Sequence, residues 1–492
     1  MKLRSILGAL VIMSLPAMPV LAENLTPEEI KKLVDEAVEK RLQEHERREG
    51  AMDRHEGSAA PAAEPGIGSL PEVGKERRSG QQAPLSFSSS GSGRLIYAKP
   101  FVSFPKAIVG GYFDIQYRAH RNSVLESGRP GGTTNGFDQQ RFVPFIYADI
   151  TEHLKFASEI EIEHAIRATN DVEISLEFAH VDYLINEKVN LRGGIVLIPL
   201  GKFNLLHDSP LNDLTDRPIV SRLIIPSTMS ETGAGLYGTF YPGRTGKLDY
   251  EVYFTTGPCG YNNDGEPRIT ETGGTKETRQ RKCGSADGLD INNGKAVSGR
   301  LAFSPILGVE VAGSGYFGNQ SATSYNPLSI FAVDWTIQKG PFELIGEAAW
   351  AHARGNSRAI TGSTFGGFSP GSLLTGVNTL NPLGLPPERM QGFYIQGNYH
   401  FMPSFLTRLS PKRFGEGSTF TAVIRYDRVN LNLANKGENG GELEQISFGL
   451  NYRPVEDAVI KMSYQYMPKS LNPNNDQRIH DSAFVISAAT YF

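Results

Sequence analysis

The sequence predicts an all-β protein, a transmembrane antiparallel β-barrel of about 16 strands. Apolar and polar side chains alternate at period two in segments of roughly ten residues, from about residue 109 to the last residue. Short and long connections alternate between these segments. No apolar run after residue 22 approaches the roughly 18 residues that a spanning helix needs. Any membrane crossing by this part of the chain would therefore require a closed barrel.

The final segment, 481–492, has the clearest alternation. An outer-membrane barrel commonly ends on such a strand, which closes the sheet against the first strand and places a terminal aromatic ring in the interfacial girdle. The alternative from this segment alone is the edge strand of a soluble β-sandwich. The predicted apolar face consists of Phe484, Ile486, Ala488, Thr490 and Phe492.

Connection lengths distinguish the barrel from the sandwich. Connections after odd-numbered segments are mostly long, such as 199–232, with 168–170 as a short exception. Connections after even-numbered segments are mostly short, such as 151–153, with 403–417 as a long exception. Outer-membrane barrels have short periplasmic turns and longer outer loops, whereas a sandwich has no reason for this alternation. We therefore expect the barrel to occupy residues 94–492.

The N-terminus predicts export. Lys2 and Arg4 precede an apolar run that ends at short residues before position 22, as in a secretory signal peptide covering 1–22. An uncleaved membrane anchor is the alternative. Together with the barrel pattern, the signal peptide predicts location in the outer membrane of a Gram-negative (diderm) bacterium.

Residues 23–48 predict a helix. Thr26 is the expected N-cap, Pro27 the first helical residue, and Glu29 completes a capping box. An apolar stripe follows at spacings of three and four. This stripe would either form a periplasmic coiled coil between protomers or lie against the protein's own barrel. Residues 49–93 are rich in small and charged residues and predict a disordered linker.

The inner face of the barrel is predicted to carry charges of both signs around an aqueous channel. The acidic residues at 159, 161 and 163 could bind cations, but salt bridges to neighbouring strands are the favoured interpretation, and no metal site is predicted. The expected pore-lining residues are Arg118, Arg141, Lys155, Glu159, Glu161, Glu163, Arg300, Arg425, Arg453 and Lys461.

The long connection at 199–233 is too apolar for a free surface loop, so we expect it to fold inward against the barrel wall. Its charges would then lie at the narrowest point and influence ion selectivity. The alternative is that they pair with one another or with the wall and only fix the loop. The charges concerned are Lys202, His207, Asp208, Asp213, Asp216, Arg217 and Arg222.

The segment from Val189 to Phe240 resembles the phosphate-selective porin family of the O and P type. The resemblance rests on Gly193-Gly194-Ile195-Val196, on Ile198-Pro199-Leu200-Gly201, and on the Pro226-Ser227-Thr228 that precedes Glu231-Thr232-Gly233-Ala234-Gly235. It implies a 16-stranded, trimeric, passive outer-membrane channel that prefers anions. The chain departs from the family's phosphate specialists, because its inner face mixes both signs and lacks a ladder of arginines. Thr490 also stands where an aromatic residue is commoner in the assembly signal.

We therefore expect an outer-membrane porin for passive diffusion of small ions and solutes, possessing no catalytic residues and no cofactor. Membrane lipid, small ions and a homotrimer are the expected partners, without nucleic acid. The alternative is a structural or adhesive barrel, or a barrel that houses a periplasmic partner. Cys259 and Cys283, the two cysteines of the chain, lie in one long outer loop of an exported protein and predict a disulfide.

Overall fold

The computed structural model describes part of the barrel region and none of residues 1–106. The predicted signal peptide, helix and linker therefore lie outside the described residues. The chain divides into two compact units, Met1–Gly80 and Gln81–Phe492, and everything described belongs to the second. The described residues are 107–121, 133–165, 173–260, 267–270, 273–279, 294–320, 325–354, 387–415, 417–434, 441–470 and 479–492.

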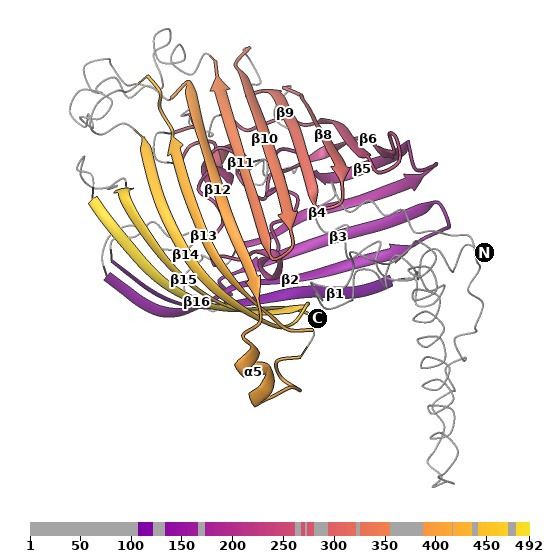
Figure 1. The fold of residues 1–492 in the computed structure, drawn as a ribbon. Helices are drawn as coiled ribbons and strands as arrows, with labels where there is room; N and C mark the ends of the chain where they lie inside the picture. Colours follow the sequence, from indigo (N-terminus) through magenta and orange to yellow (C-terminus); the bar gives the residue numbers. More distant parts are fainter. Residues whose placement is uncertain are drawn as a thin grey trace, which may run out of the picture. The chain divides into compact units, whose positions relative to one another are not determined.

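Sixteen antiparallel strands form one closed barrel, with each strand paired to its neighbours in chain order (Figure 1). This confirms the predicted fold class and strand number. The strands are β1 Ala107–Arg121, β2 Thr133–Asp149, β3 Leu154–Glu163, β4 Glu173–Leu184, β5 Asn190–Leu197, β6 Ser230–Phe240, β7 Lys247–Thr255, β8 Ala296–Ile306, β9 Val309–Asn319, β10 Pro327–Lys339, β11 Phe342–Ala353, β12 Arg389–Phe401, β13 Thr419–Asn430, β14 Glu442–Val455, β15 Ala458–Ser470 and β16 Ile479–Tyr491.

The barrel closes between its first and last strands, which lie side by side in Figure 1. Tyr117 lies opposite Ile486 in this antiparallel pair. The backbone N–H of Phe492 donates to the carbonyl of Gly111 at 3.0 Å, and the N–H of Gly111 donates back at 3.1 Å. Closure satisfies the backbone groups of both edge strands, which a bilayer could not satisfy.

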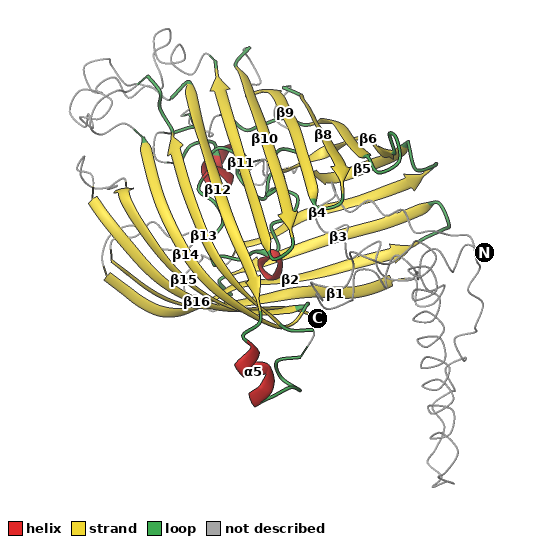
Figure 2. Ribbon diagram, in the orientation of Figure 1, coloured by secondary structure: helices red, strands yellow, loops and turns green. Residues whose placement is uncertain are grey.

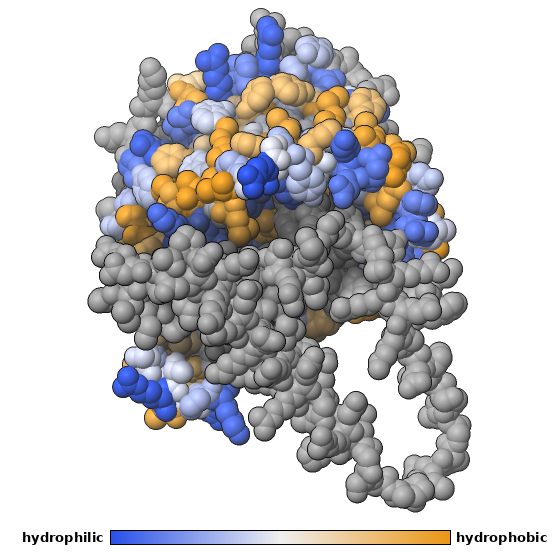
Figure 3. Space-filling model, turned by 45° about the vertical axis from the view of Figure 1, so that its right-hand side comes forward, coloured by the Kyte–Doolittle hydropathy of each residue, from blue (hydrophilic) through white to orange (hydrophobic). Residues whose placement is uncertain are grey.

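Side chains alternate between an apolar outer face and a polar inner face. In β12, Phe393, Ile395 and Tyr399 point outward, whereas Gln396 and Asn398 are buried inside. Apolar side chains gather in patches over the outside of the strands in Figure 3. The apolar face predicted for the last strand is likewise exposed, including 55% of Phe492. This is the pattern of a barrel surrounded by lipid.

Outward aromatic rings are in contact near the starts of β11 and β13 and the ends of β12 and β14. The centroids of Phe342 and Tyr399 are 5.0 Å apart, those of Tyr399 and Phe401 5.5 Å, and those of Phe420 and Tyr452 4.7 Å. Such a row of rings is typical of the girdle at a membrane interface.

Short and long connections alternate as predicted. Residues 307–308, 340–341 and 456–457 are tight turns, while the connections 198–229 and 256–295 are long. The connection predicted at 168–170 is longer, since β3 ends at Glu163 and β4 begins at Glu173. The predicted exception at 403–417 contains the helix α5, Ser404–Leu409.

The other described helices are single turns, namely η2 Ser209–Leu211, α4 Val220–Leu223 and η3 Lys276–Thr278, so strands dominate the fold (Figure 2). In the part of the chain that the structure describes, every helix is too short or too polar to span a membrane.

Candidate functional site

The candidate site is the interior of the barrel, which the connection between β5 and β6 crosses. We call residues 198–229 the inner loop. Lys202 of this loop donates to Thr336 of β10 at 2.8 Å, whereas Asp208 accepts a hydrogen bond from Tyr491 of β16 at 2.9 Å. These strands are far apart in the closed barrel order, so the loop spans the interior, as the apolar composition of 199–233 predicted.

Apolar packing holds one half of the inner loop against the wall formed by β10 and β11. Ile219, Val220 and Ile224 of the loop are at most 2% exposed and belong to one cluster with Ala332 and Ala349 of the wall. The wall offers small side chains at these positions, which leaves room for branched ones from the loop. Burial of each such side chain stabilises the docked loop by about 1.5–3 kcal/mol.

This apolar inner wall was not predicted from the sequence. Its signal is a break in the alternation, since residues 328–333 read Leu-Ser-Ile-Phe-Ala-Val and carry apolar residues on both faces. Ala348 and Ala349 break the pattern in the same way on β11. A strand of the barrel wall that is apolar on both faces needs an apolar partner on its inner face as well as lipid on its outer face. Here the inner loop covers the inner face.

Glu347 of β11 fixes the turn at the start of the inner loop. Its carboxylate accepts a hydrogen bond from the hydroxyl of Ser221 at 3.0 Å and another from the backbone N–H of Phe203 at 3.1 Å. Gly201 approaches so closely that an added Cβ would lie 2.5 Å from a carboxylate oxygen, and its φ of +68° favours glycine. One fully buried carboxylate therefore joins two separate parts of the loop.

Three basic side chains predicted to line the pore donate hydrogen bonds to backbone carbonyls of the inner loop. Lys461 of β15 donates to the carbonyl of Ser209 at 2.9 Å. Arg453 of β14 donates to the carbonyl of Pro210 at 2.7 Å, and Arg425 of β13 to a carbonyl at Asp216 at 3.1 Å. These hydrogen bonds attach the loop to the wall formed by β13, β14 and β15, so part of the positive charge has a structural role.

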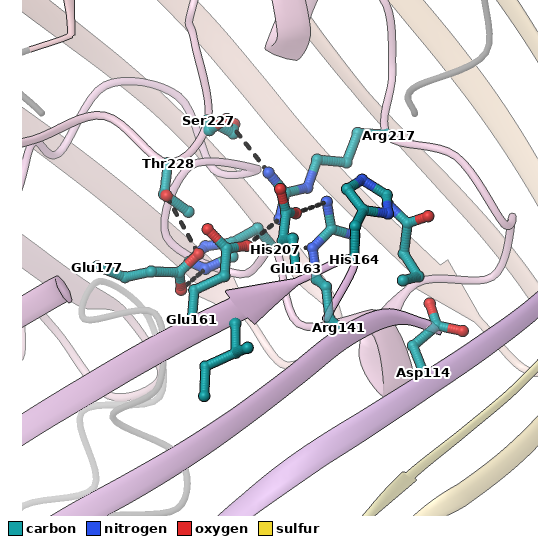
Figure 4. A network of polar contacts seen from close by, with 12 residues as sticks. Asp114, Arg141, Glu161, Glu163, His164, Glu177, His207, Arg217, Ser227 and Thr228 are labelled. Carbon is teal, nitrogen blue, oxygen red and sulfur yellow. Dashed lines mark hydrogen bonds and ion pairs between the residues drawn. The ribbon is translucent and has the colours of Figure 1, made fainter. Parts of the chain in front are cut away.

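The predicted acidic stripe on β3 forms the expected salt bridges with the neighbouring strand. Arg141 of β2 contacts Glu161 at 3.2 Å and Glu163 at 2.9 Å, and Arg217 of the inner loop lies 3.7 Å from Glu161 (Figure 4). Arg217 also donates to the carbonyl of Ser227 at 3.2 Å. The stripe is therefore largely neutralised by arginines.

The remaining predicted pore-lining cations also have partners on the wall. Arg118 contacts Gln116 and Gln140, Lys155 pairs with Asp149, and Arg300 pairs with Asp334 at 2.6 Å. The structure thus places all ten predicted pore-lining residues on the inner side of the strands. A role in solute passage stays a prediction for each of them.

Most predicted constriction residues are attached to the wall. His207 contacts Glu177, Asp213 accepts from Asn398 at 2.8 Å, and Lys202 also pairs with Glu310 at 3.2 Å. Asp216 is buried and Arg222 half-buried. This arrangement matches the alternative in which these charges fix the loop, while their effect on ion selectivity stays a prediction.

Burial inside the barrel raises the pKa of two carboxyl groups of the inner loop. Desolvation raises the pKa of Asp208 above its usual value, against the opposing effects of His207 and the hydrogen bond from Tyr491. Desolvation likewise raises the pKa of Asp213, although the nearby Arg453 lowers it. The ionised form of each group is therefore disfavoured in the docked loop.

The predicted disulfide involves the long connection between β7 and β8. Cys259 is buried and disulfide-bonded, whereas Cys283 lies outside the described residues. The pairing of these two cysteines stays a prediction.

No protein-family model matches the chain. An uncharacterized protein of Aquifex aeolicus (strain VF5) is 28% identical over 362 residues, which are 72% of this chain and 74% of that protein. Among solved structures, an anion-selective porin from Comamonas acidovorans is similar with a TM-score of 0.47 and 8% identity, over 78% of this chain and 99% of that one.

Two further solved structures are similar to this chain. The outer membrane channel DcaP of Acinetobacter baumannii has a TM-score of 0.44 and 9% identity, over 78% of this chain and 97% of that one. OmpT, an outer membrane protein of Vibrio cholerae, has a TM-score of 0.42 and 8% identity, over 80% and 100% of the two chains.

Proposed function

We propose that the protein is a porin of the outer membrane of a Gram-negative bacterium, through which small ions and solutes diffuse passively. The observation that carries the proposal is a closed 16-stranded barrel with an apolar outer face and a charged inner face. A barrel of this strand number encloses an aqueous lumen, and only its outer face meets lipid. The inner loop would narrow this lumen.

The preference of the channel for anions or cations depends on the charges along its inner face. Resemblance to the phosphate-selective porin family implies a preference for anions, and for phosphate in its finer form. Among the buried charged side chains of the described residues, however, carboxylates outnumber basic groups, and several of the latter hold loop carbonyls. Charge near a constriction sets ion preference, so a weak cation preference would follow from these residues.

Planar-bilayer recording of the purified full chain tests the proposal. We expect stepwise conductance, and the reversal potential in asymmetric KCl gives the preferred sign. Glu343→Arg, on the inner side of β11, should shift the reversal potential towards anions, whereas Leu344→Gln on the lipid side should leave it unchanged. Absence of conductance steps from folded protein would refute the channel. Replacement of chloride by phosphate tests the finer preference.

A structural or adhesive barrel, or a scaffold for a periplasmic partner, is the second candidate. The inner loop is attached to several strands around the barrel, and this favours the second candidate, because a lumen filled by the loop would not conduct ions. The same recording distinguishes the two functions: a folded, non-conducting barrel would favour the second.

We further propose assembly as a homotrimer in the membrane, with the predicted helix at 23–48 joining the protomers. The mass of the detergent-solubilised protein, corrected for bound detergent, should correspond to three chains. Deletion of 23–48 should reduce this mass, and an unchanged oligomer would exclude the coiled-coil role.

A further inference from the structure

A buried cluster of two carboxylates and one imidazole lies where the inner loop meets β3 and β4. Glu159 comes from β3, Glu177 from β4 and His207 from the loop. One ligand-forming atom of each lies within 4.8 Å of the others, and all three side chains are at most 1% exposed. Figure 4 shows His207 and Glu177 facing each other.

A β-bulge brings the second carboxylate into the cluster. In the pairing of β3 with β4, Glu159 lies opposite Phe178 and Ile160 opposite Leu176, so Glu177 has no partner in the register. Both Glu177 and Phe178 consequently point inward, against the usual alternation of a strand. Bulges commonly redirect a side chain in this way next to functional sites.

The hydrogen bonds of His207 prepare its other ring nitrogen for a cation. Nδ1 lies 2.9 Å from the backbone carbonyl of Asn204, and a carbonyl can only accept, so Nδ1 carries a proton. Nε2 lies 2.7 Å from a carboxylate oxygen of Glu177, as the second N–H donor of an imidazolium or, in the neutral ring, as an acceptor. Two acceptors at this distance repel unless a cation lies between them. A histidine that binds a metal through one ring nitrogen commonly donates the N–H of the other nitrogen to a backbone carbonyl, which fixes the orientation of the ring.

Glu159 supplies an independent indication. Neither of its oxygens accepts a hydrogen bond within the described part of the barrel, although the side chain is fully buried. Nε2 of His207 lies 3.9 Å from a carboxylate oxygen of Glu159, beyond hydrogen-bonding distance. A buried, unpaired carboxylate costs several kcal/mol, so its position beside Glu177 requires either a proton or a metal ion. Thr228 holds Glu177 from the other side, at 3.1 Å.

We propose that Glu159, Glu177 and His207 bind one divalent transition-metal ion of the zinc type, which fastens the inner loop to the barrel wall. Two carboxylates balance the charge of such an ion, and the mixed oxygen and nitrogen donors suit zinc. Ligand atoms about 2.0–2.2 Å from zinc lie roughly 3.3 Å from one another. The 2.7 Å pair would open and the 3.9 Å pair would close, each by roughly half an ångström. The alternative occupant is a proton shared between the groups.

Zinc content after refolding tests the proposal. The full chain, without an affinity tag, is refolded into detergent with ZnCl₂, because the buried site is best loaded before the loop docks. It is then dialysed, and zinc per chain is measured by mass spectrometry. Glu159→Gln removes one ligand and keeps the size and polarity of the side chain, so it should fold normally. His352→Gln, on β11, removes an exposed imidazole and controls for surface binding.

We expect about one zinc ion per chain in the wild type and in His352→Gln, together with a zinc-dependent rise in melting temperature. Loss of one ligand should weaken affinity by roughly 100-fold or more, so Glu159→Gln should retain no zinc and show no such rise. Equal zinc retention by Glu159→Gln and the wild type would overturn the site. A folded wild type that retains no zinc would also overturn it, in favour of a shared proton. These outcomes are independent of conductance.

Discussion

Removal of the Glu347 carboxylate should release the inner loop without opening the barrel. Glu347→Ala eliminates the acceptor of Ser221 and of the Phe203 N–H, while the strand ladder is made by backbone groups and persists. Hydrogen bonds to a charged group contribute about 1.5–3 kcal/mol each. Burial of the Glu347 carboxylate in the wild type has a desolvation cost, which offsets part of the energy of these two hydrogen bonds. We therefore take about 3 kcal/mol as the net loss of docking free energy in the variant. That loss corresponds to roughly a 100-fold rise in the undocked population of the loop.

Trypsin cleavage after Arg222 measures this population, because the loop must leave the wall before the protease can reach it. The initial cleavage rate of Glu347→Ala should exceed that of the wild type by roughly 100-fold. Asp249→Ala is the matched control, as it removes a buried carboxylate from the same inner face that accepts from Thr239 of β6 rather than from the loop. If both variants are cleaved at the same rate, Glu347 does not anchor the loop.

Three further predictions concern the wall and the loop. Ile395→Arg, at the middle of β12 on the lipid face, should lower the free energy of unfolding by about 2–4 kcal/mol, measured by urea unfolding from lipid. Leu307→Arg, in an exposed turn, should change this free energy little, and equal effects of the two substitutions would contradict the lipid-facing assignment. Asp182→Asn breaks the buried ion pair with Arg192, which has two contacts of 2.7 Å, and should lower the free energy of unfolding by about 3–5 kcal/mol. The double variant Asp182→Asn/Arg192→Gln should recover part of this stability, and a double variant no more stable than the single one would contradict the prediction. Burial raises the pKa of Asp213, so the contribution of this group to stability is present below the usual pKa of 3.8 and is lost as pH rises through the pKa of the folded state. The melting temperature of Asp213→Asn, relative to that of the wild type, should therefore increase from acid to neutral pH. A difference in melting temperature that does not change with pH would refute the assignment.

The sequence by itself determined the barrel. Each strand meets lipid on one side and the lumen on the other, so its period-two pattern is a local property that can be read from adjacent residues. Phe484, Ile486 and Phe492 were therefore assigned to the outer face correctly from one short stretch. Turn lengths are equally local, and they separated the barrel from a sandwich.

Only the tertiary structure decided what fills the interior. Glu347 and Phe203 are 144 positions apart in the chain, and no periodicity relates them. The inward turn of Glu177 depends on a bulge whose register is set by the neighbouring strand, and local alternation cannot specify that register. The inner loop's binding partners are thus fixed by closure of the barrel, which brings distant strands around one short segment.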